Sequence, residues 1–205
     1  MSKTLVRERK PHEPKIISNG NPVIFAEGKI GAIVHFPVLV DEGSGYVAKV
    51  FEKFVRSPGT RILAVKDKKI YLQKEVRLEV DGFDWRLPGG KVVDSFADYK
   101  EYLIKPIPEN LIIAAAAKEL QEEAGFIAKS LKILSKKTCG ATVEWDLYFI
   151  LAEEISESKD AVNHFEGEEI IEARWFPFSE VRKMCESGLV REGRSAATIV
   201  EFLSR

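Results

Sequence analysis

The first part of the chain alternates apolar and polar residues with the period of β-strands. Three segments carry this pattern and are rich in β-branched and aromatic side chains: 23–40, 45–55 and 61–77. The first breaks at Glu27 and Gly28, and the third turns at Asp67 and Lys68. Because strands bury alternate side chains and are separated by turn residues, these segments predict a mixed or antiparallel sheet.

A helical period replaces the strand pattern after two prolines. Pro108 and Glu109 suit the first turn of a helix, Pro by its fixed φ and Glu by the helix dipole. Gly125 is placed to end the helix in the left-handed conformation. At about 100° per residue, one apolar arc collects Ile112, Ile113, Ala116, Ala117 and Leu120. We therefore expect a helix from about residue 108 to 124 that packs on the sheet.

The remaining segments complete an α+β arrangement. Strand patterns return at 130–137, 143–155 and 170–178, and two helices follow, one opening at Ser179 and one from about Ser195. Residues 92–106 match no regular element. Strands before and after a central helix predict a mixed β-sheet flanked by helices, with a β-rich extension at the N-terminus.

Three carboxylates gather at the end of the central helix. Glu119, Glu122 and Glu123 lie side by side near its C-terminus, where the helix dipole costs an anionic side chain roughly 0.3 to 1 kcal/mol. Like charges three and four residues apart repel in addition. We therefore expect a positive group at this face, although a solvated helix end would also accommodate these side chains.

Composition limits the possible partners. The chain has 205 residues and a formal net charge of −1, so no global field indicates nucleic acid or an anionic membrane. Cys139 and Cys185 are too few for a disulfide framework, and no apolar run indicates a signal or a membrane span. We expect a cytoplasmic protein with a flexible arm over 1–20 and a single domain over 21–205.

A short motif resembles a known family. The Gly89-Gly90 pair followed by "KELQEEAGF" is similar to the Nudix hydrolase box, matching it at Glu119, Leu120, Glu122, Glu123, Gly125 and Phe126. Lys118 stands at the position of the box arginine, and Asn110 stands at that of the first box glutamate, which pairs with this arginine in the family. Gly90 and Glu119 are 29 positions apart, which implies an insertion at about 92–106 inside the box.

The resemblance implies a fold, a cofactor and a reaction. It implies an α/β/α Nudix sandwich that hydrolyses a diphosphate with Mg²⁺, with Mn²⁺ as the alternative metal. The implied metal ligands are Glu119, Glu122, Glu123 and the carbonyl of Gly89, with Glu122 and Glu123 also catalytic. Oxygen ligands of this kind suit hard divalent cations.

Beyond the box, the sequence resembles the ADP-ribose pyrophosphatase branch over most of 22–203. This similarity implies a nucleoside diphosphate linked to another group as substrate, such as ADP-ribose, contacted by Arg77 and Gly90. It also implies a glutamate as general base in the loop before the strand at 170–178, with Glu168 and Glu166 ranked first and Glu169 as a further candidate. Arg77 and these loop glutamates could equally be solvated surface residues.

Two other functions stay open. One is hydrolysis of nucleoside triphosphates or dinucleoside polyphosphates at the same metal site. The other is a Nudix domain that binds a nucleotide and regulates without hydrolysis, which the Asn110 substitution and the insertion allow. Relatives in the resembled branch pair through their N-terminal strands, so we expect a homodimer.

Overall fold

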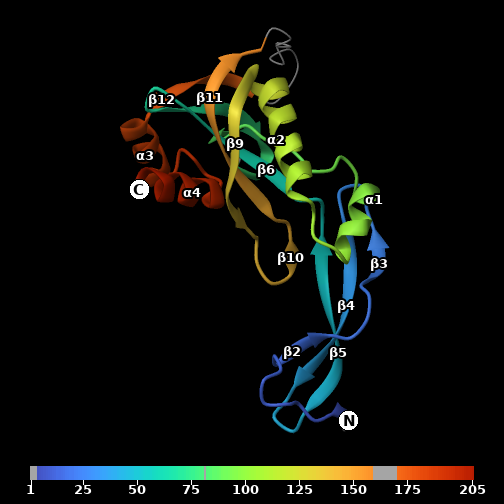
Figure 1. The fold of residues 1–205 in the computed structure, drawn as a ribbon. Helices are drawn as coiled ribbons and strands as arrows, with labels where there is room; N and C mark the ends of the chain where they lie inside the picture. The colour runs from blue at the N-terminus through green and yellow to red at the C-terminus, as the bar shows by residue number, and fades with distance from the viewer. Residues whose placement is uncertain (1–3, 81, 159–169) are drawn as a thin grey trace. The chain divides into compact units, whose positions relative to one another are not determined.

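The computed structural model describes residues 4–80, 82–158 and 170–205. Its chain divides into two compact units (Figure 1). Unit 1 contains Met1–Ser57, Val93–Pro106 and Cys139–Trp145. Unit 2 contains Pro58–Val92, Ile107–Thr138 and Asp146–Arg205. The sequence predicts one domain over 21–205, whereas the described structure groups the N-terminal strands with two later segments.

Unit 1 is built on one sheet. Its strands are β1 (Leu5–Arg7), β2 (Ile16–Ser18), β3 (Val23–Glu27), β4 (Ala32–Asp41), β5 (Tyr46–Val55) and β10 (Val143–Glu144). The order is β1-β5-β4-β2, with β3 also on β4 and β10 also on β5. β4 and β5 form a long antiparallel hairpin whose register runs from Ala32 opposite Val55 to Asp41 opposite Tyr46. The predicted break at Glu27 and Gly28 separates β3 from β4.

The N-terminal residues differ from the expected flexible arm. β1 pairs with β5 and β2 pairs with β4, both antiparallel. The side chain of Arg9 donates from Nε to Asp41 Oδ2 at 2.7 Å. The free edges of the hairpin offer backbone groups to these short strands, which a polar, basic sequence does not signal.

The segment without a predicted element also forms structure in unit 1. It contains helix α1 (Phe96–Tyr99) and the 3₁₀ helix η2 (Lys100–Leu103). The Ser95 side chain accepts a hydrogen bond from the Asp98 amide and caps α1. Lys100 forms an ion pair with Glu27 at 2.8 Å. The insertion therefore belongs to the unit of the N-terminal sheet, and its helices are too short to show a period in sequence.

Unit 2 carries the second sheet. Its strands are β6 (Gly59–Lys66), β7 (Lys69–Arg77), β8 (Gly82–Arg86), β9 (Phe126–Lys137), β11 (Leu147–Glu157) and β12 (Ile170–Pro177), and η1 (Leu78–Val80) follows β7. The order is β12-β7-β6-β11-β9, with β8 also on β7. β6 and β11 are parallel and the other pairs are antiparallel. The predicted mixed sheet is confirmed.

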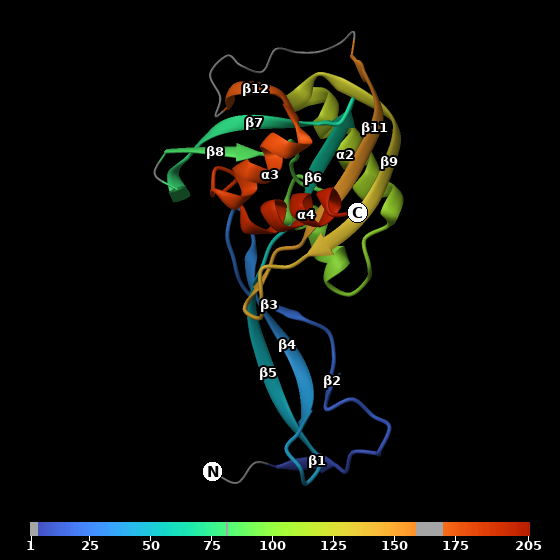
Figure 2. The ribbon, with the colours of Figure 1, turned by 90° about the vertical axis from the view of Figure 1, so that its left-hand side faces the viewer.

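Helices cover both faces of this sheet. α2 (Glu109–Ala124) packs on β9, β6 and β11. α3 (Phe178–Glu186) and α4 (Gly193–Leu203) lie on the other face (Figure 2). Between α2 and the sheet, Ile112, Ala116 and Leu120 pack against apolar residues of β6 and β11, such as Ile62 and Ile150. The α/β/α sandwich expected from the sequence is confirmed.

Local signals account for the ends of these elements. Asp67 and Lys68 adopt φ values of 50° and 56° between β6 and β7, as a tight hairpin turn requires. α2 ends where the sequence predicts, with Gly125 at φ 69° and its N–H donating to the carbonyl of Gln121 at 3.0 Å. Ala117 is expected in the apolar arc that packs on the sheet, but it is exposed.

Within the part of the chain that the structure describes, no helix is long and apolar enough to cross a membrane.

Replacing Gly125 with Ala tests the helix end. A side chain at φ 69° is strained, so we expect the free energy of unfolding to fall by about 1 to 2 kcal/mol. Urea denaturation measures this change. Gly193→Ala is the matched control, because an added Cβ there meets no atom within 4 Å and should not destabilise the protein. Equal effects at both positions would contradict the account of the α2 end.

Candidate active site

The glycine loop between β8 and α1 lies along the first residues of β6. Ile62 donates its N–H to the Pro88 carbonyl at 2.8 Å, and Thr60 donates to the Gly90 carbonyl at 2.8 Å. Gly89 has φ 147°, and an added Cβ would lie 2.2 Å from the Thr60 carbonyl oxygen. Only glycine fits at this position, because the backbone conformation and the contact with β6 both exclude a side chain.

The C-terminal part of α2 meets this loop through two of its carboxylates. Gly89 donates its N–H to Glu123 Oε2 at 2.8 Å. A Cβ at Gly90 would lie 2.0 Å from Glu119 Oε1, so the Glu119 carboxylate occupies the space beside that glycine. Four residues predicted from the sequence as site residues therefore lie together: Gly89, Gly90, Glu119 and Glu123.

The surroundings of Glu123 shift the pKa of its carboxyl group. The pKa of its carboxyl is raised from 4.5 to about 7, mainly by burial and also by the charges of Glu119 and Glu75, although the Gly89 hydrogen bond and Arg61 act to lower it. A raised pKa means that the surroundings disfavour the anion. The site accumulates negative charge that a cation would stabilise.

The Glu122 side chain lies on the solvent-exposed side of α2. Its side chain is about half exposed and forms an ion pair with Lys118 at 3.7 Å. Among the described residues, no group of three or more Asp, Glu, His or Cys side chains is arranged to hold a metal ion. The structure thus brings two of the three predicted carboxylates to the glycine loop, and participation of Glu122 stays a prediction.

The other predicted substrate and base residues are placed differently. Arg77, at the end of β7, donates from Nε to Glu75 Oε2 at 2.8 Å. Glu75 is 5% exposed, and its charge acts on Glu123, so Arg77 is connected to the site through Glu75. Glu166, Glu168 and Glu169 lie outside the described residues, and their role stays a prediction.

Comparison with known proteins identifies the family. Residues 55–192 match the NUDIX domain, which covers more than half of the chain and includes the glycine loop and α2. The chain belongs to the Nudix family. It therefore carries a diphosphatase domain, and its catalysed reaction is pyrophosphohydrolysis.

A solved structure shares the fold of this Nudix hydrolase. That structure, described as "Crystal structure of ADP compounds hydrolase", has a TM-score of 0.64 and 19% sequence identity, and the match covers 100% of this chain and 95% of the other. At this identity the likeness supports the fold. No curated protein matches the sequence.

Three residues of the Nudix site were missed in the sequence analysis. Arg61 donates from Nη1 to the carbonyls of Gly89 at 2.8 Å and Thr60 at 3.0 Å. Gln73 donates from Nε2 to the Glu123 carbonyl at 3.1 Å, and Glu75 adds its buried charge. A signal was available, because Gln73, Glu75 and Arg77 alternate along β7 and share one face.

The donor set of this site fits a divalent metal ion. Glu119 and Glu123 offer carboxylate oxygens beside a loop that offers the Gly89 carbonyl. Burial and the carboxylates of Glu119 and Glu75 raise the pKa of Glu123 despite Arg61, so a bound cation would stabilise its anion. Family members typically use divalent metals, and Mg²⁺ binds through a few carboxylates together with substrate phosphates.

Replacing Glu123 with Gln tests whether this carboxylate is held at a cost in stability. The unfolded carboxyl ionises near 4.5 and the folded one near 7, so the wild-type protein loses stability as pH rises through this window. Glutamine does not titrate and still accepts the Gly89 hydrogen bond. In EDTA, we expect the variant to be more stable by roughly 1 to 3 kcal/mol above pH 7, with the gain vanishing near pH 4.

Urea denaturation as a function of pH measures this difference. Glu122→Gln is the matched control, because its carboxylate is about half exposed beside Lys118 and should change stability little at any pH. The hydrolytic kcat of Glu123→Gln should fall by at least about 100-fold, more than the loss typical of a residue that only supports a ligand. A Glu123 variant that keeps the kcat of the wild-type protein and matches the control in stability would contradict the site.

Proposed function

We propose that this Nudix hydrolase cleaves nucleoside diphosphates linked to another group, with ADP-ribose or a related sugar nucleotide as substrate. Water adds to one phosphorus of the diphosphate, the bond from that phosphorus to the bridging oxygen breaks, and the bridging oxygen leaves with the other phosphate. ADP-ribose would give AMP and ribose 5-phosphate. The fold shared with a structure described as an ADP compounds hydrolase supports this choice of substrate class.

One observation carries the proposal. The Glu119 and Glu123 carboxylates lie against the Gly89-Gly90 backbone, at the end of a helix whose dipole disfavours them. A helix selected only for stability would place basic residues in its last turn, and α2 has none there. This arrangement is costly for folding and suits the binding of a cation and a polyanionic substrate.

Each site residue has a role in this proposal. A Mg²⁺ or Mn²⁺ ion held by Glu119, Glu123 and the Gly89 carbonyl, with Glu122 assisting, would stabilise the charge of the diphosphate and activate water. Arg77 would bind a substrate phosphate with its guanidinium, exchanging or sharing its contact with Glu75. Gly90, which has no side chain, leaves room for the Glu119 carboxylate beside the loop, and its backbone would contact the substrate. Glu168 or Glu166 would accept a proton from the attacking water.

A substrate panel tests the proposal. It contains ADP-ribose, sugar nucleotides, NADH, dinucleoside polyphosphates and nucleoside triphosphates, each with Mg²⁺ and with EDTA. We expect Mg²⁺-dependent release of a nucleoside monophosphate from ADP-ribose or a sugar nucleotide. A preference for triphosphates or dinucleoside polyphosphates would instead favour the alternative hydrolytic function named in the sequence analysis. Nucleotide binding without any cleavage would contradict the proposed reaction.

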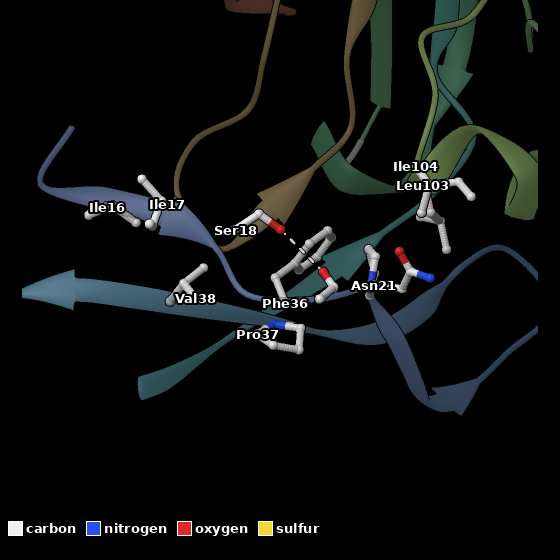
Figure 3. A pocket seen from close by; sticks show the side chains of 11 residues that line it. Ile16, Ile17, Ser18, Asn21, Phe36, Pro37, Val38, Leu103 and Ile104 are labelled. Atoms are coloured by element: carbon white, nitrogen blue, oxygen red, sulfur yellow. Dashed lines mark hydrogen bonds between the residues drawn. The ribbon is translucent and has the colours of Figure 1, made fainter. Parts of the chain in front are cut away.

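We also propose that the protein is a homodimer, formed through unit 1. Several large apolar side chains of this unit are exposed: Leu5, Ile16, Val23, Phe25, Val50 and Ile104. A pocket of about 370 Å³ in this unit is lined by two of them, Ile16 and Ile104, together with Phe36 and with Leu103 at the end of η2 (Figure 3). Exposed apolar surface of this kind is typical of protein interfaces.

Analytical ultracentrifugation tests the dimer. We expect a mass near twice the 23.1 kDa of one chain. Phe25→Glu and Ile104→Glu place charges on exposed apolar positions, 68% exposed in both cases, and should shift the protein towards one chain without unfolding it. A wild-type protein that sediments at 23.1 kDa at micromolar concentration would refute the dimer.

A further inference from the structure

A buried arginine lies directly beneath the glycine loop. Arg61 is the third residue of β6, and only 8% of its surface is exposed. Burying a guanidinium removes it from water at a considerable cost unless its N–H groups find acceptors. Its Nε has no hydrogen-bond partner among the described residues, so the cost is not fully offset. An expensive group of this kind requires a reason beyond packing.

Two of the charged groups that act on Arg61, Glu75 and Glu123, belong to the site. Burial and the charge of Arg86 lower the pKa of the guanidinium, whereas Glu75, Glu123 and Glu192 raise it. Glu123 belongs to α2 and Glu75 to β7. Arg61 is thus a buried cation of β6 whose charge acts on the carboxylates of Glu75 and Glu123.

The hydrogen bonds of Arg61 are directed at the loop. Its Nη1 donates to the Gly89 carbonyl at 2.8 Å and to the Thr60 carbonyl at 3.0 Å. The N–H of Gly89 donates to Glu123 Oε2 at 2.8 Å. Gln73, fully buried, then holds the main chain of Glu123 from β7 at 3.1 Å. Both polar backbone groups of Gly89 are therefore hydrogen-bonded to side chains, its carbonyl to Arg61 and its N–H to Glu123.

The box positions that would otherwise connect loop and helix are altered. Asn110 is exposed, and Lys118 pairs with Glu122 on the solvent side of α2 at 3.7 Å. The ion pair of Lys118 with Glu122 does not involve the glycine loop.

Thr60 and Ile62 hold the loop on β6 through main-chain hydrogen bonds. Arg61 adds a side-chain bond to the Gly89 carbonyl, and the Gly89 N–H continues this connection to Glu123 on α2.

We propose that Arg61 is a positioning residue that fixes the Gly89 backbone against Glu123 and so holds the metal-binding oxygens in place. A carbonyl oxygen has two lone pairs, so the Arg61 bond leaves the second available and sets its direction. The planar guanidinium can donate to two carbonyls in a fixed geometry, which the ammonium of lysine does not reproduce. The inference rests on the proposed metal site, and its test is separable from the identity of the substrate.

Two variants separate the charge of Arg61 from its geometry. Arg61→Met removes both, and Arg61→Lys keeps the positive charge that Glu75 and Glu123 face. Arg182→Met is the matched control, because Arg182 also donates to a main-chain carbonyl, that of Leu203 at 2.8 Å, but lies in α3. Thermal unfolding of each variant establishes that the fold is retained before any other measurement.

Two measurements independent of turnover test the proposal. Amide hydrogen exchange by NMR reports on the Gly89 N–H, which should exchange faster in Arg61→Met and, less so, in Arg61→Lys. Electron paramagnetic resonance titration with Mn²⁺ should show affinity weakened by about 10- to 100-fold in Arg61→Met, with Arg61→Lys intermediate. With a cleaved substrate, kcat should fall while KM changes little. Arg182→Met should match the wild-type protein in all three.

The proposal is overturned if folded Arg61 variants exchange the Gly89 amide and bind Mn²⁺ like the wild-type protein. If Arg61→Met does not fold, Arg61→Lys decides by the same two criteria. If the wild-type protein cleaves no member of the substrate panel, the proposed function fails, whereas exchange and Mn²⁺ binding still decide the role of Arg61.

Discussion

The hydrogen bond from the Gly89 N–H to the Glu123 carboxylate joins the two halves of the active site. One half is a loop that only glycine can form, because a side chain at Gly89 would collide with the Thr60 carbonyl. The other half is the last turn of α2, packed on the sheet through Ile112, Ala116 and Leu120. This contact joins the two halves directly, while the packing of α2 and the Gln73 bond to the Glu123 main chain hold the helix side in place.

The Gly89 hydrogen bond also favours the anionic form of Glu123, because it lowers the pKa of the carboxyl group. Glu123 is disfavoured as an anion by burial and by Glu119 and Glu75, and the Gly89 N–H and Arg61 oppose this. The fold thus keeps a carboxylate in surroundings that would protonate it near neutral pH. Such a destabilised group is typical of functional sites, where local cost is accepted for chemistry.

Sequence-local features were predictable, and features that depend on distant strands were not. The bounds of α2, the left-handed Gly125 and the turn at Asp67 and Lys68 follow from residues close together in the chain. Glu119, Glu123 and Gly89 were found because a motif connects them. Arg61 was missed because its partner Gly89 lies 28 residues away in the chain. The strands of the N-terminal arm were missed for a similar reason, since their pairing is set by the hairpin of β4 and β5.

The most direct test of the central claim is a crystal structure of the protein with Mn²⁺, located by its anomalous scattering. We expect a peak within bonding distance of carboxylate oxygens of Glu119 and Glu123 and of the Gly89 carbonyl oxygen, with the Gly89 hydrogen bond to Arg61 retained. A peak that avoids these residues, or no peak at saturating Mn²⁺, would show that the carboxylates at the end of α2 do not form the metal site.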